Sequence, residues 1–160
     1  MDTLLHAPKE RLHRPPPAWK PAAAPSADSN AALRELCRGF QPTGGMASGD
    51  DLALLMGRSS PQPISQLARW IVAREVLCVE WQTQTLLPLF QFSCGLHGLR
   101  PGMAAALREL VDVFDAWELA LWFARGNRAL GGASPADTLA RDGTAVWQAA
   151  RTDRFIAAGL

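Results

Sequence analysis

Three carboxylates in the C-terminal half have the clearest potential for chemistry. Asp112, Asp115 and Glu118 recur at intervals of three, which would place them on adjoining turns of a helix. Paired carboxylates can perform acid–base catalysis, but this spacing is also typical of a solvated helix face, where the charges could attract a basic partner. The chain has no glycine-rich nucleotide loop, no Gly-x-Ser-x-Gly motif, and no histidine near a plausible nucleophile and acid. We therefore expect a binding protein and not an enzyme.

The cysteines and histidines do not form the groups that metal sites or disulfides require. Cys37, Cys78 and Cys94 stand singly at wide spacings, without a Cys-x-x-Cys pair. Such an odd count argues against both a disulfide framework and a structural zinc site. The histidines are equally scattered, at positions 6, 13 and 97. We expect no metal and no cofactor, and we interpret the cysteines as small buried thiols.

Length and composition indicate one globular domain or two very small ones. The chain has 160 residues, of which 48% are hydrophobic, so wholesale disorder is excluded. A formal net charge of +1 gives no bulk signal for nucleic-acid binding, which would need a local basic patch. No apolar stretch approaches the ~18 residues of a membrane span, and the first residues lack the apolar region of a secretory signal. We expect no membrane association and a cytoplasmic location.

Half of the prolines lie in the first 30 residues, which predicts an extended or disordered tail over residues 1–28. The tail is faintly basic. Its predicted roles are an inert or adaptor-binding segment, or an arm that tethers DNA.

Residues 29–99 have the pattern of a helix-turn-helix-like pair followed by a β-hairpin. After a short helix lined by Leu33, Leu36 and Cys37, Ser48 can cap a helix through Met56, with Leu52 and Leu55 on its apolar face. A second helix from about 62 to 74 has an apolar stripe: Ile64, Leu67, Ala68, Ile71 and Val72. The apolar runs 76–81 and 86–92 then predict a hairpin, with Pro88 at an edge or bulge.

Two interpretations of this helix pair remain open. In the first, the unit is a small winged DNA-binding module in which four polar residues reach base edges: Gln62, Ser65, Gln66 and Arg69. In the second, the helices and hairpin only complete a core, and the same residues form a solvated face.

Residues 100–160 are predicted to be entirely helical. Pro101 should open a helix through about Asp115, with Met103, Leu107 and Phe114 in its buried stripe. The segment 117–123 is apolar nearly all round, which indicates a helix that is enclosed or covered by a partner. Ser134 and Pro135 should begin a short helix, and the last helix should run from about Thr144 through Ile156, with three residues facing inward: Val146, Ala150 and Ile156. The predicted fold is therefore mainly α, a small helical bundle with one β-hairpin that follows a helix-turn-helix-like pair.

The segment 122–139, WFARGNRALGGASPADTL, resembles the toxin-binding domain of the Xre/MbcA/ParS-type antitoxins. That family combines an aromatic-ended helix, an Asn, a Leu-Gly-Gly turn, and a Pro that begins a helix ending in Leu. A last helix follows, whose Val and Ala-Arg step match Val146 and Ala150-Arg151 here. The segments 52–57 and 88–92 fit further elements, so the resemblance covers roughly residues 46–159, although only 122–139 is specific.

The resemblance implies an antitoxin of a type II toxin–antitoxin system. Its partner would be a RES-domain toxin, which degrades NAD or transfers ADP-ribose from it, and the antitoxin would cover the toxin's active-site cleft. We expect the toxin contacts to lie in or near the last helix, and the complex to contain a homo-oligomer; the contact residues would be Asn127, Arg128, Trp147, Arg151, Arg154 and Phe155. The competing interpretation is that Trp147 and Phe155 pack inside and the arginines only add solubility. Operator binding is expected of the family's N-terminal domain, but this chain lacks an evident five-helix repressor domain there.

Two other functions fit the sequence. The chain could be a stand-alone DNA-binding transcription regulator that dimerises through its C-terminal helices, with the hairpin as a wing. It could also be an accessory protein whose proline-rich tail recruits a groove-bearing partner. A RES-domain gene beside this one would favour the antitoxin.

Overall fold

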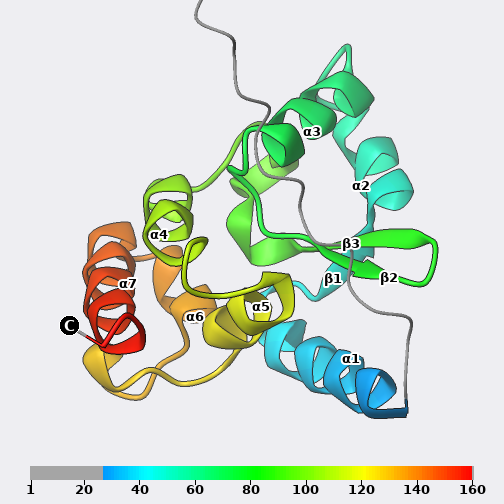
Figure 1. Ribbon diagram of the computed structural model, residues 1–160. Helices are drawn as coiled ribbons and strands as arrows, with labels where there is room; N and C mark the ends of the chain where they lie inside the picture. The colour runs from blue at the N-terminus through cyan, green and yellow to red at the C-terminus, as the bar shows by residue number, and fades with distance from the viewer. Residues whose placement is uncertain (1–26, 160) are drawn as a thin grey trace, which may run out of the picture.

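The computed structural model describes residues 27–159 and is mainly helical, with one small sheet (Figure 1). The predicted fold class is thereby confirmed. The α-helices are α1 (Ala27–Phe40), α2 (Gly49–Met56), α3 (Pro63–Val72), α4 (Met103–Leu110), α5 (Ala116–Ala124), α6 (Pro135–Leu139) and α7 (Gly143–Ala157). The strands are β1 (Met46–Ser48), β2 (Val79–Trp81) and β3 (Gln84–Pro88). The predicted tail lies outside the described residues, except that its last two residues begin α1.

The sheet is antiparallel, in the order β1-β3-β2. The predicted hairpin is present as β2 and β3, which pair Val79 with Leu86 and Trp81 with Gln84. Its second arm was predicted to run to Phe92, but the strand ends at Pro88 and residues 89–91 form a 3-10 turn. The strand β1, which pairs Met46 with Pro88, was not predicted.

The sheet separates two hydrophobic clusters, because successive side chains of a strand point to opposite faces. On β3, Leu86 packs against the larger cluster, whose members come mostly from α1 and α4–α7, and Leu87 belongs to the smaller cluster beneath α2 and α3. The larger cluster unites Leu36 and Phe40 of α1 with Leu107 and Phe123, so one core spans the predicted boundary at residue 100. Figure 1 shows the result: α4–α7 gather at one end, and α2 and α3 lie at the other.

Gln91 joins the hairpin to the segment that precedes it. Its side chain is fully buried, and its amide oxygen accepts a hydrogen bond from Leu77 N at 2.7 Å. The amide nitrogen donates to the carbonyl oxygens of Leu77 and Pro88, at 2.8 and 2.9 Å. One side chain thus bonds to three backbone groups in the interior.

The prediction of one helix from Pro101 to Asp115 was wrong. The helix α4 begins at Met103, because Gly102 has a φ of +90°, and it ends at Leu110. A Cβ atom on Gly102 would lie 2.6 Å from the carbonyl oxygen of Gly143, so glycine is needed where α4 and α7 begin side by side. Asp115 instead caps α5, accepting from the backbone N–H of Glu118 while the Glu118 carboxylate accepts from Asp115 N.

Several residues predicted to be buried are exposed. On α3 only Leu67 is buried, while Ile64 and Val72 are 73% and 79% exposed, because this edge helix packs on the smaller cluster along a narrow stripe. Leu55 and Ile156 are also exposed, the latter because the last turn of α7 extends past the core. Cys37 and Cys94 are exposed and were wrongly expected to be buried.

The helices among residues 27–159 are all too short or too polar to cross a lipid bilayer.

Candidate functional site

The segment that carries the family resemblance forms a helix–loop–helix between α5 and α6. Asn127 begins a 3-10 turn over Arg128–Leu130, and Gly131 and Gly132 then reverse the chain with φ values of +67° and +88°. Ser134 accepts a hydrogen bond from Asp137 N, and Pro135 occupies the first turn of α6, as predicted. The loop therefore has a single defined course from α5 to α6.

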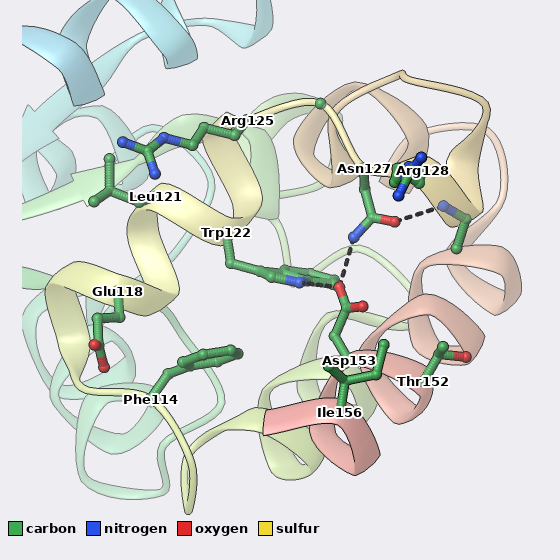
Figure 2. Close-up of a pocket in the computed structure, with 12 residues that line it drawn as sticks. Phe114, Glu118, Leu121, Trp122, Arg125, Asn127, Arg128, Thr152, Asp153 and Ile156 are labelled. Carbon is green, nitrogen blue, oxygen red and sulfur yellow. Dashed lines mark hydrogen bonds between the residues drawn. The ribbon is translucent and has the colours of Figure 1, made fainter. Parts of the chain in front are cut away.

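Asp153 ties this loop to α7. One carboxylate oxygen, Oδ2, accepts hydrogen bonds from Trp122 Nε1 and from Asn127 Nδ2, both at 2.7 Å (Figure 2). Trp122 comes from α5 and Asn127 from the loop, so one carboxylate joins three segments. Asp153 was not among the predicted site residues, because its partners lie 31 and 26 positions away in the sequence.

Every polar group of Asn127 has a partner within the chain. Its side-chain oxygen accepts from Ala129 N at 2.8 Å, and its backbone N–H donates to Ala133 O at 2.9 Å. Its carbonyl oxygen accepts from Gly132 N at 2.9 Å. Asn127 was predicted to contact a toxin. Its hydrogen bonds show that it also shapes the loop, and the toxin contact stays a prediction.

An open groove of about 550 Å³ runs between α5, this loop and α7. Its walls are largely apolar, formed by Phe114, Leu121, Trp122 and Ile156 (Figure 2). Charged side chains also line it, among them Asp153 and Arg128. Such a surface suits a protein segment with an apolar face.

A second row of predicted contact residues lies on α7 beside α4. Trp147 Nε1 donates to Glu109 Oε1 at 3.1 Å, and Arg154 pairs with Glu109 Oε2 at 2.9 Å. The Arg151 guanidinium lies 5.1 Å from the centre of the Trp147 ring. Phe155 is 45% exposed. The six predicted toxin-contact residues thus divide between the groove and the α4 side of α7.

Glu109 makes the contact between α4 and α7 sensitive to acid. The hydrogen bond from Arg154 is the main reason that the pKa of Glu109 lies below its usual value of 4.5. A carboxyl group with a lowered pKa in the folded state contributes stability above its usual pKa and loses it as the pH falls through the lowered pKa.

We expect Glu109→Gln to reduce the free energy of unfolding at neutral pH. The difference from the unmodified chain should shrink as the pH falls below 4.5 and vanish once Glu109 is protonated. Denaturant unfolding at a series of pH values measures this difference. An equal difference at every pH would show that the ion pair with Arg154 does not contribute.

Three of the four predicted DNA contacts lie on α3, and Gln62 is the residue immediately before it. Gln62, Ser65 and Arg69 are exposed, at the spacing of one helix face. Gln66 is half-buried, and its amide oxygen accepts a hydrogen bond from Ser60 Oγ at 3.0 Å, so it supports the turn before α3. In Figure 1, α3 and α7 lie at opposite ends of the molecule, so these residues are remote from the groove.

The described residues offer no group of three or more His, Cys, Asp or Glu that could hold a metal ion. Of the three carboxylates with the greatest potential for chemistry, Asp115 and Glu118 are engaged in capping α5. Cys78 is half-buried, and burial, with a smaller effect of Glu80, raises the pKa of its thiol to about 11. A thiol that holds its proton so firmly is a poor nucleophile.

The chain matches no protein-family model, and neither curated proteins nor solved structures show a detectable similarity to it.

Proposed function

We propose that this protein is the antitoxin of a type II toxin–antitoxin system, and that it binds and neutralises a RES-domain toxin by covering its active site. The supporting observation is the exposed end of α7, where Phe155 and Ile156 are 45% and 70% exposed beside the apolar groove. Exposed apolar and aromatic side chains next to Arg151 have the composition of interface anchors. The chain would act as a binding protein in the cytoplasm, where NAD and the toxin are found together, and would not be an enzyme.

The surface that we assign to the toxin consists of Arg128, Arg151, Phe155 and Ile156. Arg151 is exposed and stacks on Trp147, which holds its charge in one place. Three further residues would support this surface without touching the toxin: Trp147, Arg154 and Asn127. Each is hydrogen-bonded to another element of the chain. The predicted set therefore divides into residues that would contact the toxin and residues that would support them.

Phe155→Ala and Arg151→Glu should each weaken toxin binding by at least about tenfold, since truncated interface anchors cost 1–2 kcal/mol or more. Co-expression with the toxin measures neutralisation as growth, and titration of the purified proteins measures affinity. Arg141→Glu is the matched control, because Arg141 is exposed between α6 and α7 and its side chain has no hydrogen-bond or ion-pair partner among residues 27–159. Full neutralisation by both variants would contradict the assignment of this surface.

A second activity, operator binding, is favoured by the exposed residues Gln62, just before α3, and Ser65 and Arg69 on α3. Exposed apolar side chains on the same pair of helices, Leu54, Ile64 and Val72, would suit a homo-oligomer that presents two such helices to DNA. Arg69→Ala should weaken binding to the DNA upstream of the gene in a gel-shift assay. If this activity is present and no toxin binds, the protein is a stand-alone regulator.

A further inference from the structure

The outer face of α3 carries an apolar stripe that no other part of residues 27–159 covers. Ile64, Ala68 and Val72 recur at intervals of four and are all exposed, Ile64 by 73% and Val72 by 79%. Residues at this spacing lie within about 80° of one another around the helix axis, so they form one continuous strip. Leu54 on the neighbouring helix α2 is 76% exposed and adds apolar surface at this end of the molecule (Figure 1). Such a row of exposed apolar side chains is typical of a protein–protein contact.

The order of side chains along the stripe is nearly symmetric. A small residue, Ala68, stands at the centre, and a β-branched apolar residue stands four positions away on each side. If two copies of α3 pack antiparallel about a two-fold axis at Ala68, Ile64 of each copy meets Val72 of the other, and the two alanines meet each other. The small central side chain lets the two helices approach closely. The antiparallel orientation also places the N-terminus of each helix near the C-terminus of the other, which the helix dipoles favour.

The stripe carries no charge that would oppose such a contact. Arg69 is the only charged residue between Pro63 and Val72. It follows Ala68 by one position, about 100° further round the helix, so both copies of Arg69 would lie at the rim of the contact and remain in solvent. Charges exposed at a rim cost little, because water and salt screen them.

We propose that two copies of the chain associate through the stripe formed by Ile64, Ala68 and Val72, with their α3 helices antiparallel about a two-fold axis at Ala68. This inference goes beyond the proposed function, because it requires neither toxin nor DNA and specifies one contact and its symmetry. The contact is small, so we expect a dissociation constant in the micromolar range, roughly 1–100 μM.

The N-terminal segment of the same chain is a poorer occupant of the stripe. The stripe spans nine residues, and an antiparallel helix that matches it needs the same length without an interior proline. Residues 1–26 contain six prolines, and no run without proline among them exceeds seven residues. A second copy of α3 has the required length and the required order of side chains.

Analytical ultracentrifugation of the full chain at about 1–500 μM tests the association. We expect a monomer–dimer equilibrium, and Ile64→Asp should raise its dissociation constant at least about tenfold, because an unpaired carboxylate would enter the apolar contact. Ile156→Asp is the matched control, because Ile156 is 70% exposed but lies on α7, at the opposite end of the molecule (Figure 1). It should leave the dimer unchanged. Both changes are made at exposed positions, so both variants should fold.

Cysteine cross-linking tests the symmetry. Cys37→Ser and Cys94→Ser first remove the two exposed native thiols. In that background, Ala68→Cys should form a disulfide with its own copy under diamide, because the two Cα atoms would meet at the two-fold axis. Val72→Cys should not, because its two copies would lie about 12 Å apart along the helices, beyond the ~7 Å that a disulfide spans.

A chain that stays monomeric throughout this concentration range would overturn the inference. So would a dimer that survives Ile64→Asp, that is lost in Ile156→Asp, or that requires residues 1–26, because each result places the contact elsewhere. Copies of Val72→Cys that cross-link as readily as those of Ala68→Cys would show a parallel pair and contradict the proposed symmetry.

These measurements contain neither toxin nor DNA, so their outcome is separate from that of the proposed function. A monomeric chain that neutralises the toxin would contradict this inference alone. A dimer with the expected response to Ile64→Asp, but without toxin binding, would contradict the antitoxin proposal alone.

Discussion

Asn127→Asp is expected to lower the free energy of unfolding by about 2–4 kcal/mol at neutral pH and to abolish partner binding at the groove. The change replaces an amide that donates to Asp153 Oδ2 at 2.7 Å with a second carboxylate at the same place. Two negative charges at this distance repel, and Trp122 and the loop should lose their fixed arrangement.

The double variant Asn127→Asp with Asp153→Asn should regain part of the stability that Asn127→Asp loses. The amide nitrogen placed at position 153 can donate to the new carboxylate, but the bond from Trp122 Nε1, which ended on the same Asp153 oxygen, is then lost. The carboxylate at position 127 can still accept from Ala129 N, as Asn127 does. Asp112→Asn serves as the control for loss of a charge, because Asp112 is exposed and its side chain has no hydrogen-bond or ion-pair partner among residues 27–159. A double variant no more stable than Asn127→Asp would show that this pair does not hold the site together.

Gln91→Leu is expected to reduce the free energy of unfolding by about 3–5 kcal/mol. It removes all three hydrogen bonds from a fully buried side chain, and it leaves the N–H and C=O of Leu77 and the C=O of Pro88 without partners. Each unsatisfied buried group costs about 1–3 kcal/mol, partly offset by the apolar side chain. Thermal and denaturant unfolding measure the loss.

Gln148→Leu is the control for this substitution, because Gln148 is exposed on α7 and its side chain makes no hydrogen bond to any of residues 27–159. It should change stability by about 0.5 kcal/mol or less. If the two variants were equally stable, the buried amide would not be what joins the hairpin to the segment before it.

The elements that the sequence predicted correctly are those with local signals at their ends. Ser48 caps α2, Ser134 and Pro135 begin α6, and the apolar repeat of α7 places Val146 and Ala150 inward. These features depend on residues three or four positions apart, so a single segment contains the information. The hairpin was found because an apolar run overlaps each of its strands, although the polar Gln84 and Thr85 that begin β3 were not predicted to belong to it.

The missed features depend on contacts between distant segments. The strand β1 has only three residues and exists because β3, about 40 positions later, pairs with it. The early end of α4 and the exposed side of α3 follow from which cluster each helix meets, which periodicity does not specify. The segment 122–139 was identified from the sequence, but its hydrogen bonds to Asp153 were not predicted. From the sequence alone, an aspartate on a helix such as α7 is expected to be a solvated surface charge.

The measurement that tests the central proposal most directly is the NAD consumption of a RES-domain toxin from the same organism, with and without this chain. We predict inhibition that reaches completion at a fixed molar ratio, with a complex of the same ratio seen by native mass spectrometry. Phe155→Ala should raise the concentration needed by at least about tenfold, and Arg141→Glu should not change it. Undiminished NAD consumption in a large excess of the chain, with no complex in the mass spectrum, would contradict the proposal that this protein is an antitoxin.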